Sequence, residues 1–241
     1  GWWDFGTGAL GDMGCHIMET PFSALGLGYP TEAEASCTTN WVGDFVEADY
    51  NASCPASSIV RLKFNTEAQG DIALNWYDGG LKPDLPDELK DDETIGDSGG
   101  GSIFYGTKGI LVTDTYSRNA RLLPSETMAM FNPPTPTLTR IEGDTSGHAM
   151  NFVNGCLNNT ATSSDFAKAG PLTEAVLMGN LAIKAYQYKE LKPGKKIGDW
   201  DPFQYPGRRK ILWDGANMRV TNYEKANEWV KGNYRKGWEL K

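Results

Sequence analysis

The chain has 241 residues, of which 39% are hydrophobic and 11% aromatic, enough apolar material for the core of one large domain over residues 1–241. Its formal net charge of −8 disfavours nucleic acid as a partner. No apolar run approaches the roughly 18 residues of a membrane span, so we expect none.

The first third of the chain predicts two helices followed by strands. Residues 8–19 favour a helix, and the Thr-Pro pair at 20–21 ends it and starts a second, short one. Residues 32–42 predict a strand. Residues 58–66 and 71–79 alternate between apolar and polar side chains on either side of a short turn, which predicts a β-hairpin.

The acidic stretch 81–100 carries seven acids against two lysines, and its Pro and Gly content favours a solvated loop. Apolar spacing then indicates further elements along the rest of the chain. These are two strands in 101–115, a third in 120–125, helices over 146–159 and 170–188, a strand over 209–215, and a last helix over 222–234 capped by Asn222.

This order of elements predicts an α+β fold with an open, mainly antiparallel sheet and helices packed on one face. A doubly wound parallel sheet would alternate strand and helix throughout. An antiparallel sheet can leave its other face uncovered, and a large apolar patch there would require a partner. We therefore expect a homodimer or homotetramer that forms through the sheet face.

The stretch from Gly6 to Gly11 reads G-x-G-x-x-G, the spacing of a dinucleotide fingerprint. That motif works only as the turn between a buried strand and a helix. Only five residues precede it here, and two of them are the adjacent Trp2 and Trp3. We therefore interpret the glycines as the start of the first helix, with no cofactor-binding residue assigned to them.

Asp12 and His16 are the residues most able to carry chemistry. On a helix, residues four apart share a face, so the carboxylate can orient the imidazole and favour its protonated form. Such a pair can act as a general acid/base, although most pairs at this spacing are ordinary surface pairs. Gly11 and Gly14 are expected to leave backbone open beside the pair. The other histidine, His148, is expected to make a helix-terminal hydrogen bond.

The same stretch, GTGALGDMGCHIMET, resembles the Gly-rich G-x-x-x-D-x-G-x-H-x-x-D motif of the Gfo/Idh/MocA oxidoreductases (glucose–fructose oxidoreductase, inositol dehydrogenase and relatives). Gly8, Asp12, Gly14 and His16 match, and Glu19 replaces the last Asp of the motif. The residues before the motif and the C-terminal third resemble a bacterial subgroup of that family, so the resemblance covers the whole chain.

The resemblance implies that this chain is the C-terminal substrate-binding and oligomerisation domain of a longer enzyme whose Rossmann domain, which would bind NAD or NADP, is missing. His16 would then be the catalytic acid/base that removes a hydroxyl proton as hydride leaves for the nicotinamide, and Asp12 would orient it. Gly14 and Glu19 would contact a carbohydrate or polyol substrate. This fragment alone is expected to bind no cofactor and to be inactive.

Two other functions remain open at this point. Some relatives use transient oxidation by bound NAD to cleave a glycosidic bond, and the aromatic side chains would also suit a non-catalytic carbohydrate-binding or assembly module. The four cysteines, at positions 15, 37, 54 and 156, lack metal-ligand spacing, so no metal site is predicted. Cys37 and Cys54 are either buried thiols or a bridge. The compartment, bacterial cytoplasm or periplasm, is not indicated.

Overall fold

The computed structural model describes residues 1–44, 46–49, 51–232 and 234–239. These residues form two compact units: one comprises residues 1–84 and 172–241, and the other comprises residues 85–171. Helices and strands are mixed, and every pair of neighbouring strands among the described residues is antiparallel, so the predicted α+β class is confirmed. The assignment of residues 1–241 to one substrate-binding domain stays a prediction.

The first unit contains a five-stranded sheet in the order β12-β11-β1-β4-β5. In β4, alternate residues from Ser58 to Thr66 are buried, as expected for a strand with one face on a core. The predicted hairpin is confirmed, because β4 and β5 pair from Ile59 opposite Tyr77 to Thr66 opposite Gly70. The strands are β1 (Glu32–Cys37), β4 (Ser58–Thr66), β5 (Gly70–Tyr77), β11 (Ile211–Asp214) and β12 (Arg219–Val220).

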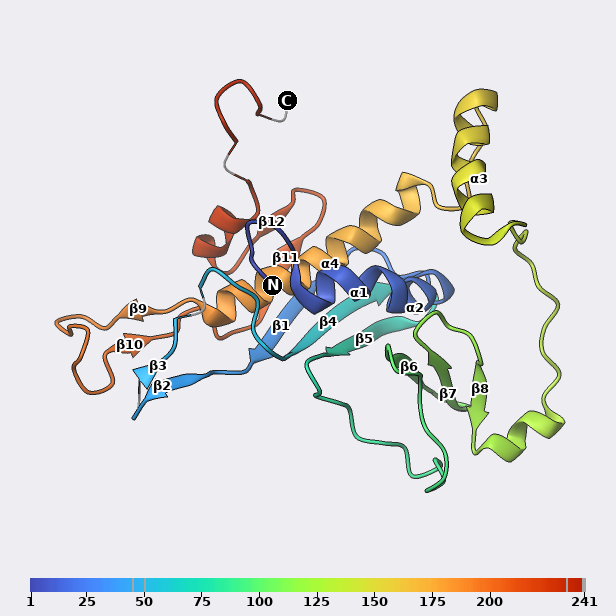
Figure 1. Cartoon of the computed structure of the whole chain (residues 1–241), viewed down its shortest axis with the longest axis horizontal. Helices are drawn as coiled ribbons and strands as arrows, with labels where there is room; N and C mark the ends of the chain where they lie inside the picture. Colours follow the sequence, from blue (N-terminus) through green and yellow to red (C-terminus); the bar gives the residue numbers. More distant parts are fainter. Residues whose placement is uncertain (45, 50, 233, 240–241) are drawn as a thin grey trace. The chain divides into compact units, whose positions relative to one another are not determined.

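Three helices cover one face of this sheet: α1 (Gly8–Ile17), α2 (Glu19–Ala24) and α4 (Phe166–Gln187) (Figure 1). The helix break predicted near residue 20 is therefore confirmed, and α4 begins earlier than expected. At Gly179 of α4 an added Cβ would stand 2.4 Å from Leu10 Cδ2 and 3.2 Å from Val60 Cγ1. The lack of a side chain at this position lets α1, α4 and the sheet approach closely.

The opposite face of the sheet is charged. Arg61 and Lys63 of β4 are exposed, and Glu32 of β1 forms ion pairs with Lys63 (3.1 Å) and Lys210 (3.3 Å). These two partners hold the pKa of Glu32 below its usual value against the opposing effect of burial. The same face also carries Leu212, which is 40% exposed, and assembly through it stays a prediction.

The second unit holds a three-stranded sheet in the order β6-β7-β8, as predicted for this part of the chain. Its elements are β6 (Gly101–Gly106), β7 (Gly109–Asp114), β8 (Arg121–Leu123), the 3₁₀ helix η1 (Ser125–Met130) and α3 (Asp144–Asn158). The apolar side chains of α3 remain exposed, including Phe152 at 60% and Leu157 at 76%.

Two small hairpins complete the first unit. They consist of β2 (Trp41–Gly43) with β3 (Val46–Glu47), and β9 (Glu190–Leu191) with β10 (Phe203–Gln204). In place of the predicted last helix there is only the 3₁₀ helix η2 (Glu224–Trp229). The prediction that Asn222 caps a helix is wrong, because Tyr223 occupies the N-cap position of η2. Asn222 instead accepts a hydrogen bond from Leu212 N and donates one to Lys210 O, so its side chain is used by the neighbouring strand.

Candidate functional site

The Gly-rich stretch is the start of α1. Gly8 is the first residue of the helix and has a positive φ of 67°, and a Cβ there would lie 2.7 Å from Cys54 Sγ. Before it, Trp2 forms only an isolated antiparallel bridge with Ser53. The predicted start of the first helix in this stretch is therefore confirmed, and the interpretation that the glycines bind no cofactor stays a prediction.

The inner side of α1 packs on α4. Leu10 is fully buried, and a Cβ on Gly14 would lie 3.1 Å from Val176 Cγ2. A Cβ on Gly11 would meet Thr7 and come within 3.3 Å of Asn180 Nδ2. The expectation of open backbone at Gly11 and Gly14 is therefore wrong, because both glycines serve helix packing. The substrate-binding role of Gly14 stays a prediction.

The outer side of α1 carries Asp12 and His16. Both residues are exposed and lie four positions apart on one uninterrupted helix, so they share a face. His16 lies in the last turn of this helix. Cys15 is also exposed, and its thiol donates to the Asp12 carbonyl oxygen at 3.5 Å. The structure therefore places the predicted acid/base and its orienting residue where a ligand can reach them.

Glu19 opens α2 and is exposed. Its carboxylate accepts hydrogen bonds from Ser23 Oγ at 2.8 Å and from Thr20 Oγ1 at 3.5 Å. Its position in the first turn suits the positive end of the α2 dipole. These contacts give Glu19 a local structural role, and its contact with a substrate stays a prediction.

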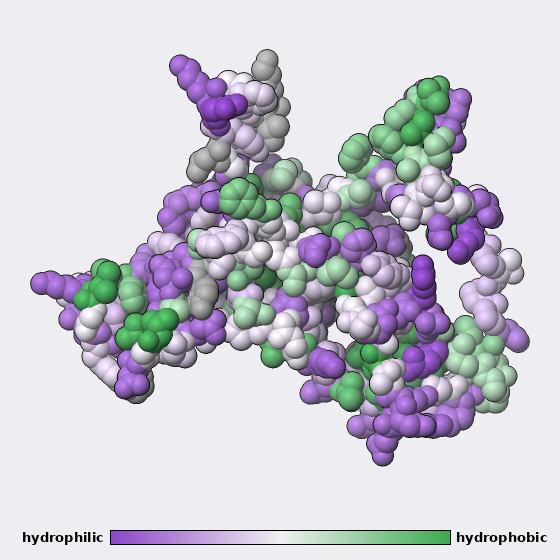
Figure 2. Space-filling view, viewed as in Figure 1, coloured by the Kyte–Doolittle hydropathy of each residue, from purple (hydrophilic) through white to green (hydrophobic). Residues whose placement is uncertain are grey.

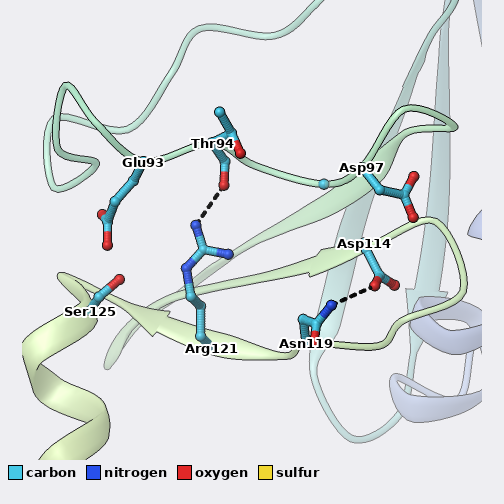
Figure 3. Close-up of a pocket in the computed structure, with 8 residues that line it drawn as sticks. Glu93, Thr94, Asp97, Asp114, Asn119, Arg121 and Ser125 are labelled. Carbon is cyan, nitrogen blue, oxygen red and sulfur yellow. Dashed lines mark hydrogen bonds between the residues drawn. The ribbon is translucent and has the colours of Figure 1, made fainter.

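A pocket of about 340 Å³ lies in the second unit, and none of the sequence-predicted site residues lines it (Figure 3). Arg121 of β8 extends across it and donates to the Thr94 carbonyl at 2.6 Å. Glu93 and Ser125 lie on one side of the guanidinium in Figure 3, and Asp97, Asp114 and Asn119 on the other. The lining is almost wholly polar.

Most acceptors in this pocket are already bonded within the loops. Asp97 accepts from the backbone N–H groups of Gly99 and Gly100 and from the Thr115 hydroxyl, and the Thr115 bond is the main cause of its lowered pKa. Asp114 accepts from Arg118 N at 2.6 Å and from Asn119 Nδ2 at 3.0 Å. The two aspartates therefore stabilise the loop turns that shape the pocket.

Sequence reasoning did not single out this pocket. Glu93 and Asp97 belong to the acidic stretch that was interpreted as a solvated loop, while Arg121 follows 24 positions after Asp97. The usable signal is the run Asp-Ser-Gly-Gly at 97–100, which is typical of a turn closed by an aspartate side chain. Nothing in the sequence pairs that turn with Arg121.

A second, smaller pocket in the first unit has a volume of about 40 Å³, close to that of a few water molecules rather than of a sugar. Glu47 lies within it, accepts from Tyr205 OH at 2.7 Å and pairs with Lys189 at 3.7 Å. Burial and the bond to Glu47 raise the pKa of Tyr205 to about 12. Burial likewise raises the pKa of Cys37 to about 12.

Neither pocket is lined by Asp12 or His16. All four cysteines are free thiols in the structure. Within the described part of the chain, no group of three His, Cys, Asp or Glu side chains is arranged to hold a metal ion. None of the helices described is both long enough and apolar enough to cross a bilayer.

Comparison with known proteins adds no assignment: a scan against protein-family models and a search of curated proteins each found no match to this chain.

Proposed function

We propose that this chain is the substrate-binding part of an NAD(P)-dependent oxidoreductase that acts on a hydroxyl group of a sugar, polyol or related compound. His16 is the general acid/base in this proposal, and Asp12 orients its imidazole. The observation that supports it best is the exposure of both side chains, one helical turn apart, on the outer side of α1.

The packing of α1 on the core suits the role of a helix that carries a general acid/base. A general base must be held within hydrogen-bond reach of the proton that it accepts, with little freedom to move away. The inner side of α1 is fixed by Leu10 and Gly14 against α4, so the backbone that carries His16 is anchored in the core. An alcohol is too weak an acid to lose its proton unaided, and an imidazole at this position would accept it.

The described residues do not fit a nicotinamide cofactor by themselves. They contain no parallel βαβ unit, and the only G-x-G-x-x-G run is built into α1. The proposal therefore assigns to this chain substrate binding and proton transfer alone. Because neither pocket includes His16, the substrate pocket needs a second wall beside α1, which the dinucleotide-binding domain implied by the family resemblance would provide.

Mutation of the two histidines tests the proposal. In the complete protein, His16→Ala should lower turnover of a polyol or sugar substrate by about 10²–10⁴-fold, the usual contribution of a general acid/base. The matched control is His148→Ala, which removes the other histidine, exposed on α3. Free imidazole should partly restore turnover to His16→Ala. Equal turnover in the wild type and His16→Ala would rule His16 out of the mechanism.

Product analysis separates this reaction from the glycosidase alternative. A dehydrogenase releases NADH or NADPH in proportion to the oxidised substrate. A glycosidase that oxidises its substrate only transiently releases sugar with no net reduced cofactor. Incubation of the complete protein with free sugars and with aryl glycosides, each with added NAD or NADP, distinguishes the two outcomes.

The polar pocket of the second unit favours one further candidate, a non-catalytic carbohydrate-binding module. Arg121 offers donors and Glu93 offers acceptors to the hydroxyl groups of a sugar, within a volume that suits one or two rings. Under this alternative Arg121→Ala abolishes sugar binding measured by calorimetry, and His16→Ala leaves it unchanged. The oxidoreductase proposal expects the loss of turnover in His16→Ala described above.

A further inference from the structure

Two hairpins of the first unit project side by side and expose large apolar side chains. We define the acidic hairpin as residues 41–44 and 46–49 and the lysine hairpin as residues 189–204. Figure 1 shows them at the same end of the unit, as β2–β3 and β9–β10, and Figure 2 shows hydrophobic side chains gathered on them. Their exposed apolar residues are Trp41, Val42, Val46, Leu191, Ile197 and Trp200.

This exposure is large for side chains of their type. Trp41 is 57% exposed and Trp200 is 72% exposed. Because an aromatic side chain buries about 150–250 Å², these two alone leave on the order of 250 Å² open. That is close to a third of the roughly 800 Å² that each partner contributes to a standard interface, and four aliphatic side chains add to it.

The hairpins also lack the support that small sheets need. Each contains only two strands, of two or three residues each. An isolated two-stranded ribbon is marginally stable in water, and its strand edges leave backbone groups available for pairing. A covering partner would bury the apolar side chains and stabilise both hairpins.

The charges of the two hairpins are complementary. The acidic hairpin carries Asp44, Glu47 and Asp49 and no base, whereas the lysine hairpin carries four lysines against three acids. Glu47 already bonds to Tyr205 and Lys189, which joins the hairpins within one chain. Asp44 and Asp49 on one side and Lys195 and Lys196 on the other remain exposed.

We infer that a second copy of this chain covers this surface, in a two-fold dimer whose acidic hairpin faces the partner's lysine hairpin. A two-fold interface presents the same patch on both subunits, so the patch must be complementary to itself. A surface with an acidic half beside a lysine-bearing half meets that condition. On the sheet face, by contrast, the exposed residues of β4 include the charged Arg61 and Lys63. This inference is independent of the proposed oxidoreductase activity.

The first test is the oligomeric state of the complete protein in sedimentation velocity experiments over a range of concentrations. The wild type should be dimeric, or a higher oligomer built from this dimer. Trp41→Ser combined with Trp200→Ser should weaken the association at least tenfold. Trp238→Ser is the matched control, because it removes a tryptophan that is 68% exposed outside both hairpins, and it should leave the association unchanged.

The second test uses charge reversal, which keeps the size of the surface nearly constant. One variant carries Asp44→Lys with Asp49→Lys, and the other carries Lys195→Glu with Lys196→Glu. Each alone should be monomeric because both contacts of its dimer are repulsive. Mixed in equal amounts, they should form a heterodimer, because each hairpin of one variant then faces an opposite charge at both contacts.

Three results would overturn the inference. The first is a wild type that stays monomeric at high micromolar concentration, which would leave the hairpins to a different kind of partner. The second is a dimer that survives the tryptophan and charge-reversal variants but is lost in Arg61→Glu with Lys63→Glu, which would assign the interface to the sheet face. The third is a pair of charge-reversal variants that stay monomeric when mixed. Far-UV circular dichroism of each variant confirms that it is folded.

Discussion

The two sides of α1 differ in almost every physical property, although their residues alternate along only ten positions. The inner side presents Leu10 and Gly14 to α4 and is buried. The outer side presents Asp12, Cys15 and His16 to solvent. One helix thus separates the residues that stabilise the fold from those proposed to act on a substrate.

A helix that is packed on one side and exposed on the other can hold a candidate site rigidly and still leave it accessible to a ligand. The packing contacts and the exposed side chains lie on different sides of α1, so substitutions on the two sides should have separable effects. Inner substitutions should reduce stability. Outer substitutions should leave stability nearly unchanged while they affect function.

The largest expected effect on stability belongs to Leu10→Ala. Leu10 is 1% exposed, and removing a buried leucine side chain costs about 2–5 kcal/mol of the free energy of unfolding, depending on how far the cavity collapses. Urea denaturation should show this loss. Leu177→Ala on the exposed side of α4 is the matched control, with 47% of the residue exposed, and should cost much less. Equal costs would contradict the burial described for α1.

Gly179→Ala should have the next largest effect. Its Cβ would stand 2.4 Å from Leu10 Cδ2, so the buried side chain of Leu10 would have to shift. Overpacking of this kind costs about 1–3 kcal/mol, partly offset by the better helix propensity of alanine. Gly170→Ala is the control, because a Cβ there meets nothing within 4 Å. An unchanged urea midpoint in Gly179→Ala would show that α1 and α4 are not in close contact.

Thiol reactivity compares a partly buried cysteine with an exposed one directly. Cys15, on the outer side of α1, should react at pH 8 with an aromatic disulfide reagent faster than Cys37, whose pKa is raised to about 12 by burial. Cys15→Ser and Cys37→Ser identify which thiol gives each phase. Because folding raises the pKa of Cys37 from 9.0, its contribution to stability is complete below pH 9 and is lost as the pH rises toward 12. A fast Cys37 phase in the native protein would contradict its burial.

The smallest effect on stability is expected for Asp12→Asn. Asp12 is exposed, and surface substitutions of this kind usually change the free energy of unfolding by less than about 0.5 kcal/mol. Turnover should nevertheless fall if Asp12 orients His16, and most of the loss should appear in kcat rather than KM. A variant with full turnover would remove Asp12 from the proposed function while leaving the test of His16 intact.

Local sequence patterns predicted much of the fold. The alternation in residues 58–66 and 71–79 predicted a hairpin, and the pairing of β4 with β5 confirms it. Period-2 alternation and short turns are local properties, so a single sequence reveals them. The same reasoning failed at residues 222–234, where Asn222 bonds to a neighbouring strand instead of capping a helix.

The candidate site was predictable only in part. The shared face of Asp12 and His16 follows from helical spacing alone. The packing of Gly14 against Val176 does not, because these residues are 162 positions apart and only the fold brings them together. The polar pocket around Arg121 likewise depends on a loop and a strand whose sequences carry no common pattern.

Local patterns in the sequence sufficed to predict the order of most helices and strands, the class of fold, and the two side chains that share the outer side of the first helix. These are consequences of backbone periodicity and turn chemistry over a few residues. Three features became known from the folded chain: which glycines pack in the core, which face of the sheet is charged, and which apolar side chains stay exposed on the two hairpins. Burial depends on contacts between residues that are distant in the chain, and local periodicity does not encode those contacts.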